Sequence, residues 1–463
     1  MTEPTQRTFS PVDGRLLVER PLANDDAIDA AIDAGRAAFQ EWRRVPLSQR
    51  IERLSVMVDA FVAQTAALGP ELSWQMGRPV RYGPGEVRGF EDRARTMLRL
   101  APEALADIVP PAKEGFTRFI AREPLGLVLI LAPWNYPYLT VVNVLIPALA
   151  AGNAVILKHS DQTPLCAERL FDAARRAGLP AGLFQVLHTD HARVARLVAD
   201  PRVDQVAFTG SVEGGRAVHA AAAGTFKLVG LELGGKDPAY VRADADLAYA
   251  VENIVDGACF NSGQSCCGVE RVYVHRDLYT NFVEAAAALV AQYRLGDPLD
   301  PETTLGPVVR PRNAELIRGQ VQAAIAAGAR PLVDPAAFSL DRPGSAYVAP
   351  QVLIDVDHGM ELMREETFGP VFGVMPVDSD EQAIALMNDS RFGLTASLWT
   401  QDEAAALAIG RRLETGTVFM NRADYLDPEL AWVGVKDSGR GCTLSRVGYE
   451  GLTRPKSFHL RRI

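Results

Sequence analysis

A cysteine and a glutamate in glycine-rich surroundings could together support covalent catalysis. Glu232 opens the run Glu-Leu-Gly-Gly-Lys, and Cys266 ends the run Asn-Ser-Gly-Gln-Ser-Cys. A thiol can form a covalent intermediate, and a carboxylate can activate the water that hydrolyses it. The glycines allow the backbone to approach a ligand closely. An isolated cysteine is more often an inert core residue, so the hypothesis depends on the rest of the chain.

Alternating strand and helix signals predict the framework that positions these residues. The first hundred residues are mostly helical, and an extended stretch broken near Pro124 follows them. Thr163 and Pro164 then predict a helix start, with a hydroxyl cap and proline at the first position. The expected helices are 27–42, 49–68, 164–176, 192–199, 278–293 and 313–327, and the expected strands are 154–157, 184–187, 205–208, 352–356 and 371–377. The alternation predicts an α/β fold with parallel sheets in two halves, and the cleft between them as the ligand site.

Composition and charge exclude several classes of function. The 463 residues are 48% hydrophobic and carry a formal net charge of −9, which disfavours binding to nucleic acids or anionic membranes. The start of the chain lacks an apolar signal-peptide core, and the apolar stretches 125–132 and 141–151 are too short to span a bilayer. We therefore expect a cytoplasmic protein without a membrane partner.

The cysteine and histidine spacing predicts neither a disulfide framework nor a metal site. The five cysteines are spread over a long chain, and the seven histidines are scattered. Neither residue type forms the paired spacing of a zinc site. We therefore expect no metal.

Two strand ends carry residues suited to a dinucleotide. The strand 205–208 is followed by Thr-Gly-Ser (209–211) and a predicted helix, so Gly210 and Ser211 would present backbone N–H groups to a pyrophosphate. The same pattern also fits an ordinary glycine-softened turn, because it is not the G-x-G-x-x-G fingerprint. Lys158 and Asp161 follow the strand 154–157, at the sheet edge where open α/β sheets bind ligands.

Four runs in order make the chain resemble the NAD(P)-dependent aldehyde dehydrogenase superfamily. They are Pro-Trp-Asn-Tyr-Pro (133–137), Glu-Leu-Gly-Gly-Lys (232–236), Gly-Gln-Ser-Cys (263–266) and Glu-Thr-Phe-Gly-Pro (366–370). The resemblance covers nearly the whole chain. It implies an aldehyde dehydrogenase-like fold, with a variant Rossmann cofactor domain at 1–104 and 124–235 and an α/β catalytic domain at 236–448. A small β oligomerisation element would comprise 105–123 and 449–463.

The resemblance also implies a role for each catalytic residue. Cys266 would attack the aldehyde carbon, and the Asn135 side-chain amide with the Cys266 backbone N–H would stabilise the developing oxyanion. After hydride transfer, Glu232 would activate the water that hydrolyses the thioester to a carboxylic acid.

The cofactor residues implied by the resemblance are Trp134, Lys158, Asp161, Gly210, Ser211, Glu366 and Phe368. Lys158 would contact the adenosine ribose, Glu366 the nicotinamide ribose, and Ser211 with Trp134 the pyrophosphate. Where relatives carry Lys-Pro-Ser/Ala-Glu, this chain has Lys-His-Ser-Asp (158–161). The Asp161 carboxylate should repel a 2′-phosphate, which predicts NAD as cofactor, whereas His159 could accommodate that phosphate and leave NADP possible.

The substrate is an aldehyde that the sequence does not identify. By the resemblance its tunnel would be lined by Tyr136, Leu139, Asn143, Ser265, Cys267, Asp424, Leu426 and Trp432. Tyr136 and Trp432 suit an apolar or aryl aldehyde, whereas Arg422 could bind the carboxylate of a semialdehyde. Near the C-terminus the chain departs from the family pattern at Ala-Trp-Val-Gly (431–434) and at Cys442-Thr443.

Three alternatives remain beside oxidation to a free acid. A dehydrogenase that passes the acyl group to coenzyme A would generally lack a glutamate at position 232. A thiol hydrolase would normally require a histidine partner for Cys266. A retired enzyme with a structural role would be expected to lose Cys266, Glu232 or Asn135, and all three are present.

The segments 114–122 and 457–461 resemble the family's oligomerisation strands, so a homodimer or homotetramer is expected.

Overall fold

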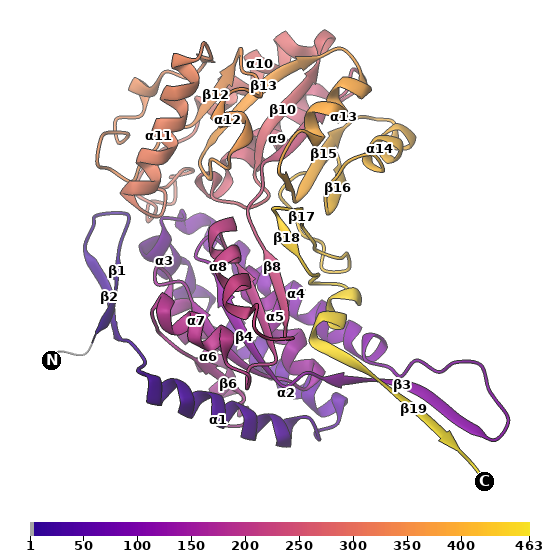
Figure 1. Ribbon diagram of the computed structural model, residues 1–463. Coiled ribbons are helices and arrows are strands. Elements are labelled where there is room, and N and C mark those ends of the chain that lie inside the picture. The colour runs from indigo at the N-terminus through magenta and orange to yellow at the C-terminus, as the bar shows by residue number, and fades with distance from the viewer. Residues whose placement is uncertain (1–3) are drawn as a thin grey trace.

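The computed structural model describes residues 4–463, and these form two α/β halves and a projecting two-stranded arm (Figure 1). The helices of the N-terminal half are α1 (Asp25–Trp42), α2 (Leu47–Val62), α3 (Thr65–Met76), α4 (Gly83–Ala104), α5 (Pro137–Ala151), α6 (Pro164–Arg176), α7 (His191–Ala199) and α8 (Val212–Ala222). Those of the second half are α9 (Leu247–Cys259), α10 (Arg276–Val290), α11 (Pro311–Ala326), α12 (Glu361–Arg364), α13 (Asp380–Asn388) and α14 (Glu403–Gly410). The predicted α/β class is confirmed.

The first half is built on a six-stranded sheet in the order β18-β8-β7-β4-β5-β6. Its strands are β4 (Leu127–Ala132), β5 (Ala154–His159), β6 (Phe184–Val186), β7 (Gln205–Thr209), β8 (Leu228–Glu232) and β18 (Gly439–Arg440). All neighbours are parallel except β18, which pairs antiparallel with β8. Every residue of β4 is buried, as expected for a central strand covered by helices on both faces.

The second half contains a seven-stranded sheet in the order β11-β12-β13-β10-β9-β15-β16. Its strands are β9 (Asp237–Val241), β10 (Val269–His275), β11 (Arg330–Pro331), β12 (Gln351–Ile354), β13 (Val371–Val377), β15 (Thr395–Trp399) and β16 (Thr417–Met420). The sheet is parallel apart from the short edge strand β11. A two-stranded pair, β14 (Phe392–Gly393) with β17 (Val435–Lys436), leads the chain back toward the first half.

Most predicted elements are present, with two differences in the N-terminal half. The single helix expected at 49–68 is two helices, because the chain turns at Ala63–Gln64 between α2 and α3. The apolar pattern continues through this turn and therefore does not indicate it. A hairpin of β1 (Thr5–Phe9) and β2 (Leu16–Pro21) precedes α1 and was not expected.

The predicted hydroxyl cap of α6 was wrong. The Thr163 hydroxyl and His159 Nδ1 lie 3.0 Å apart and form a hydrogen bond, so within the described residues its partner is the imidazole rather than the helix backbone. The helix begins at Pro164 as expected. Both ring nitrogens of the buried His159 need hydrogen-bond partners, and the Thr163 hydroxyl bonds to one of them instead of capping the helix.

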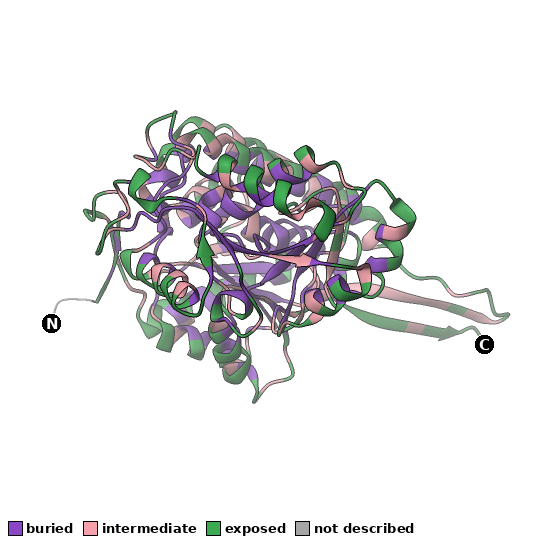
Figure 2. Ribbon diagram, turned by 90° about the horizontal axis from the view of Figure 1, so that it is seen from above, coloured by how far each residue is buried: buried purple, intermediate pink, exposed green. Residues whose placement is uncertain are grey.

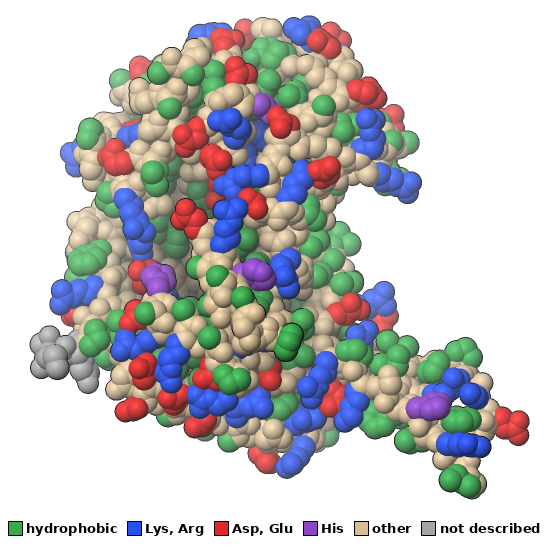
Figure 3. All heavy atoms as spheres, in the orientation of Figure 1, with side chains coloured by type: hydrophobic (Ala, Val, Ile, Leu, Met, Phe, Trp, Pro, Cys, Tyr) green, Lys and Arg blue, Asp and Glu red, His purple; other side chains and the backbone are tan. Residues whose placement is uncertain are grey.

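The arm consists of β3 (Phe116–Pro124) and β19 (Thr453–Arg461), paired antiparallel over their whole length. Both strands are intermediate or exposed at nearly every position, in contrast to the buried sheets (Figure 2). The space-filling view shows apolar, basic and histidine side chains together on this projection (Figure 3). The arm thus lies away from both hydrophobic cores.

Candidate active site

The predicted cofactor and catalytic residues collect at the carboxyl edge of the first sheet. Asn135 follows β4, Asp161 follows β5, Ser211 follows β7, and Glu232 is the last residue of β8. In the sheet order, the chain runs outward from β4 to β5 and β6, then returns to β7 on the opposite side of β4. Open α/β sheets bind ligands at such a switch point.

Cys266 is half-buried in the loop between the short helix η2 (Phe260–Gly263) and β10. Asn261 in η2 has a left-handed φ of 55°, an unusual conformation for a residue other than glycine. The side-chain amide of Asn135 donates to the Gln264 carbonyl at 3.2 Å, and that of Asn261 donates to the Asn135 carbonyl at 3.1 Å. These reciprocal bonds fix Asn135 against the cysteine loop.

Two glycines allow neighbouring loops to reach the cysteine loop. A Cβ atom on Gly235 would collide with the Cys266 carbonyl oxygen, and one on Gly263 would collide with the Gly369 backbone. Gly263 also has a left-handed φ of 70°. The turn after Glu232, the cysteine loop and the loop that contains Gly369 therefore converge at one place.

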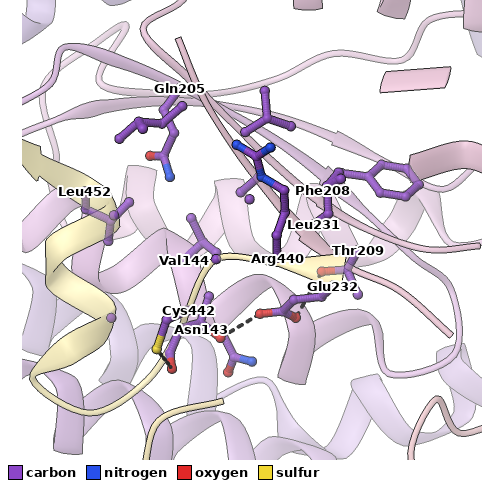
Figure 4. Close-up of a pocket in the computed structure, with 18 residues that line it drawn as sticks. Asn143, Val144, Gln205, Phe208, Thr209, Leu231, Glu232, Arg440, Cys442 and Leu452 are labelled. Carbon is purple, nitrogen blue, oxygen red and sulfur yellow. Dashed lines mark hydrogen bonds between the residues drawn. The ribbon is translucent and has the colours of Figure 1, made fainter. Parts of the chain in front are cut away.

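Glu232 is held by two hydroxyl groups. Thr443 Oγ1 donates to one carboxylate oxygen at 2.6 Å, and Thr209 Oγ1 donates to the other at 3.2 Å. Burial raises the pKa of Glu232, and the two hydroxyls partly oppose that effect. The carboxylate faces a cavity of about 220 Å³ that is also lined by Asn143 and Cys442 (Figure 4). A base with a raised pKa beside space for water is suited to activating that water.

The loop 366–368 presents the predicted nicotinamide-side residues. Glu366 accepts a hydrogen bond from the Gly235 N–H at 3.0 Å, and burial raises the pKa of Glu366 to about 8. Trp134 and Phe368 meet edge to face, with ring centroids 5.6 Å apart. Phe368 has a left-handed φ of 52°, so this loop is held in an unusual backbone conformation.

A buried ion pair that the sequence did not single out holds this loop. The Glu270 carboxylate accepts from the N–H groups of Thr367 and Phe368 at 2.8 and 2.9 Å. The same carboxylate pairs with Lys236 Nζ, and both side chains are almost completely buried. Glu270 lies between Val269 and Arg271 in the buried strand β10, and only the loop it meets in three dimensions explains why a carboxylate is tolerated there.

Of the adenosine-side residues, Lys158 lies near the end of β5 and Asp161 follows this strand. Burial lowers the pKa of Lys158. Burial alone would raise the pKa of Asp161, but Arg310, which donates to its carboxylate at 2.8 Å, helps to hold it below the ordinary value. Arg310 was not predicted, because it belongs to the second half of the chain.

His159 cannot take the part that the sequence left open for it. Its ring is 1% exposed, and its Nε2 lies 3.1 Å from the Pro137 carbonyl oxygen while Nδ1 bonds to Thr163. Burial lowers its pKa to about 4, so the ring is neutral near pH 7. The expectation that His159 could accommodate a 2′-phosphate was therefore wrong.

Three of the predicted substrate residues meet at one carboxylate. Asp424 accepts from Ser265 Oγ at 2.7 Å and from Cys267 Sγ at 3.0 Å, and the Tyr136 hydroxyl lies 3.5 Å away. Burial raises the pKa of Asp424 to about 6. The residue has a φ of 47°, so the loop around it is also held in a left-handed conformation.

The other predicted substrate residues lie around the same region. Trp432 is buried in the apolar cluster that contains Cys267, and Leu426 packs against that cluster. Leu139 and Asn143, on α5, both accept hydrogen bonds from Arg93. Arg422 is exposed and stacks over the Tyr425 ring at 3.3 Å from the ring centroid.

Two buried arginines complete the site, and the sequence reading missed both. Arg78 donates to the Asn135 carbonyl at 2.6 Å, pairs with Glu86 and lies over the Tyr136 ring. Arg93 on α4 reaches the two α5 residues named above. The available signal was a charged residue within an apolar helical stripe, because Glu86 and Arg93 occupy positions of α4 that alternate with buried apolar residues.

The described residues hold neither a group of metal ligands nor a membrane-spanning helix. Across residues 4–463, no three His, Cys, Asp or Glu side chains are grouped so that they could hold a metal ion. Within the same range, every helix is too short or too polar to cross a bilayer. All five cysteines, each within the described chain, are free thiols.

Comparison with known proteins gives consistent results over the full length. A sequence model described as the aldehyde dehydrogenase family matches residues 1–458. Succinate-semialdehyde dehydrogenase [NADP(+)] 1 of Mycobacterium tuberculosis is 36% identical over 446 residues, covering 95% of this chain and 96% of the relative. Succinate semialdehyde dehydrogenase [NAD(P)+] Sad of Escherichia coli is 34% identical over 441 residues, covering 95% of each chain.

A solved structure gives the same result for the fold. The NAD-dependent aldehyde dehydrogenase from Sinorhizobium meliloti superposes with a TM-score of 0.95 at 33% sequence identity. The superposition covers 99% of this chain and 92% of that one.

Proposed function

This chain belongs to the aldehyde dehydrogenase family. We propose that it oxidises an aldehyde to a carboxylic acid with NAD(P), and that Cys266, Glu232 and Asn135 are its catalytic residues. The observation that carries the proposal is the convergence of three distant segments. Asn135 is bonded to the cysteine loop, and the turn after Glu232 packs against the Cys266 carbonyl.

The residues around the cofactor region fit a dinucleotide. Ser211 caps α8 by accepting from the Gly214 N–H at 3.2 Å, which leaves the start of this helix beside the sheet edge. Trp134 and Phe368 meet edge to face, and Phe368 lies in the same loop as Glu366. When bound, NAD(P) supplies the hydride acceptor, and these residues orient it.

Each protein residue then has a defined task. Cys266 attacks the carbonyl carbon, and the Asn135 amide with the Cys266 N–H stabilises the oxyanion of the resulting thiohemiacetal. Loss of hydride leaves a thioester on Cys266. Glu232 removes a proton from a water molecule, the hydroxide attacks the thioester, and the thiol leaves as the free acid forms.

Purified protein tested with a panel of aliphatic, aryl and ω-carboxy aldehydes provides the direct test. We expect NADH to appear with the wild type and with Cys259→Ala, a control that removes a buried thiol from the end of α9. Cys266→Ala should abolish NADH production, and retained turnover would remove Cys266 from the role of nucleophile. NADP is assayed in parallel.

NAD is the proposed preferred cofactor, and NADP is a possible one. The Asp161 carboxylate near the expected ribose position disfavours a 2′-phosphate, while its pairing with Arg310 moderates that repulsion. The M. tuberculosis relative is named for NADP and the E. coli relative for NAD(P). Equal turnover with both cofactors at equal concentration would contradict the preference for NAD.

For the substrate, we infer an aldehyde that carries a second, carboxylate group. Both relatives described above are succinate-semialdehyde dehydrogenases, and they cover almost the whole chain.

The two alternatives within the fold are less well supported. Transfer of the acyl group to coenzyme A does not need the Glu232 base, and a retired structural protein does not need the hydroxyl bonds that hold it.

We also propose that the chain functions as a homodimer or homotetramer in the cytoplasm. The domain limits remain those expected above, with the β3–β19 arm as the core of the oligomerisation element. Apart from a bridge between Ile108 and Ile120 on the β3 side, the edges of the arm are unpaired within the described residues, and a second chain would cover them. Five free thiols suit a reducing compartment.

A further inference from the structure

Arg93 is a buried cation beside the proposed substrate region. It lies in the middle of α4, is 8% exposed, and projects from the helix stripe that faces α5. One terminal nitrogen, Nη1, donates to the Leu139 carbonyl at 2.8 Å and to Asn143 Oδ1 at 3.2 Å. Both acceptors are uncharged, so these bonds orient the guanidinium without neutralising it.

The remaining donors of Arg93 lack partners within residues 4–463. Nε and Nη2 make no hydrogen bond in this range, and Arg93 forms no ion pair there, whereas the buried Arg78 pairs with Glu86. Unlike the unpartnered Nε of Arg50, which is fully buried, these two atoms keep some accessible surface. A buried guanidinium with an open, unpaired edge is a site for a planar anion such as a carboxylate.

Two observations relate Arg93 to the reacting groups. Asn143, its hydrogen-bond partner, lines the cavity that Glu232 faces (Figure 4). Burial lowers the pKa of Arg93, and the opposing influences come from Cys267, Glu232 and Cys266. Through Asn143 the guanidinium is therefore one hydrogen bond away from the cavity that Glu232 faces, and it is bonded directly to neither Glu232 nor Cys266.

We propose that Arg93 binds the far carboxylate of an ω-carboxylated aldehyde while Cys266 attacks its carbonyl carbon. The assignment rests on the proposed function and identifies the residue that sets its substrate class. Arg422 was the arginine that the sequence offered for this task, but it is exposed and stacked on Tyr425. Arg93 is the buried one, and a charge-assisted bond is stronger where water is excluded.

Asp424 is a second charged group among the predicted substrate residues and limits how the substrate can bind. Its carboxylate is engaged by Ser265 and Cys267, so a second carboxylate would be repelled from that wall when Asp424 is ionised. The substrate carboxylate is thereby directed toward α4 and Arg93. The two charged walls together favour one orientation of a short, singly charged aldehyde.

The test compares 4-oxobutanoate with butanal, which has the same chain length and no charge. In Arg93→Met we expect kcat/KM for 4-oxobutanoate to fall by about 10- to 100-fold, the scale of a lost bond to a charged group, while kcat/KM for butanal stays within about twofold. Arg93→Lys should lie between wild type and Arg93→Met. Arg88→Met, an exposed arginine on the same helix, is the matched control and should change neither value.

The pattern across the two substrates decides the outcome. An equal loss of kcat/KM on both substrates in Arg93→Met would assign Arg93 a structural role and overturn the proposal. Unchanged kcat/KM values for both substrates would overturn it as well. If the wild type oxidises butanal but not 4-oxobutanoate, the carboxylate assignment fails while aldehyde oxidation stands. If it oxidises neither, nor any other aldehyde of the panel, the proposed function fails.

A binding measurement keeps the assignment testable without turnover. Succinate, which carries the same distal carboxylate, should bind the Cys266→Ala protein in a calorimetric titration. Adding Arg93→Met should weaken that binding by about tenfold or more, and adding Arg88→Met should leave it unchanged. Succinate binding that does not depend on Arg93 would contradict the site.

Discussion

Glu232 acquires its character as a base from opposing effects of its immediate neighbours. Burial raises its pKa, and the Thr443 and Thr209 hydroxyls lower it by donating to the ionised form. Thr443 belongs to the pair at which the chain departs from the family pattern, and it holds the carboxylate with a neutral donor. The hydroxyls also fix the carboxylate in one orientation, which a general base requires.

Removing the Thr443 hydroxyl should therefore shift the pH dependence of thioester hydrolysis. In Thr443→Val the ionised form of Glu232 loses a donor, its pKa rises, and the acidic limb of the hydrolysis rate moves to higher pH. On that limb we expect a rate about three- to tenfold lower than in the wild type, the worth of one hydrogen bond. Single-turnover kinetics across pH gives the limb directly.

Thr443→Ser keeps the hydroxyl and is the control. Its limb should remain at the wild-type pH. A Thr443→Val protein with an unmoved acidic limb would show that Thr443 does not tune the base.

The proposed catalytic residues could be singled out from sequence, whereas the residues that support them could not. Cys266, Glu232 and Asn135 lie in short local runs that carry their own signal. Glu270 and Arg93 contact segments far along the chain, so their charges stand out within a strand and a helix but cannot be explained from the neighbouring sequence. The partners of Arg93 become visible only when α4 packs on α5, and those of Glu270 only when β10 packs on the loop 366–368.

At the scale of elements, one buried ion pair joins two strands and a loop of the second half. Lys236 immediately precedes β9, Glu270 lies in β10, and the carboxylate of Glu270 accepts the N–H groups at the start of the loop that carries Glu366 and Phe368. The pair thus connects the catalytic sheet to the residues expected around the nicotinamide ribose.

Glu270→Gln should weaken both the fold and cofactor binding. The amide oxygen can still accept from one N–H, but Lys236 is left buried without a carboxylate. Breaking a buried pair in this way costs about 3–5 kcal/mol. We expect a lower melting temperature and an NADH dissociation constant raised by about tenfold or more, measured by thermal unfolding and by fluorescence titration.

Glu302→Gln, at an exposed ion pair with Arg294, is the control and should change neither quantity. Wild-type NADH affinity in Glu270→Gln would argue that the loop 366–368 is ordered by other contacts.

Parallel strands were the elements most readily predicted from sequence, because their continuous apolar runs leave little ambiguity. The turn between α2 and α3 was missed, since no proline or glycine marks it and the apolar pattern runs through it. The pairing of β18 with β8 could not be predicted either. It joins two residues of the C-terminal region to a strand two hundred positions earlier, and two residues carry too little pattern to indicate a strand.

At the scale of the whole molecule, the β3–β19 arm is an isolated two-stranded ribbon. Phe119 and Phe458 stack across it with ring centroids 4.5 Å apart, and Leu460 is 52% exposed near its tip. Two strands without a covering layer are at best marginally stable in water. A second chain packed on the arm would cover its edges and its aromatic face.

Light scattering should accordingly give a mass that is a multiple of 50.1 kDa. Phe458→Glu places a charge on the ribbon face and should shift the mass toward that of one chain. Phe226→Glu, at an exposed residue outside the arm, should leave the assembly intact. A wild-type particle of one chain's mass would contradict the proposed oligomer.

The return of the C-terminal segment to the first sheet has a consequence for biosynthesis. A growing polypeptide displays its reactive thiol, at position 266, long before Thr443 has been made to hold Glu232 or β18 has been made to pair with β8. The long sequence separation of these contacts also makes them late to form in folding. Ribosome-bound or prematurely terminated chains therefore carry the proposed nucleophile in an incomplete setting, and the groups proposed for hydrolysis are assembled only when synthesis is nearly finished.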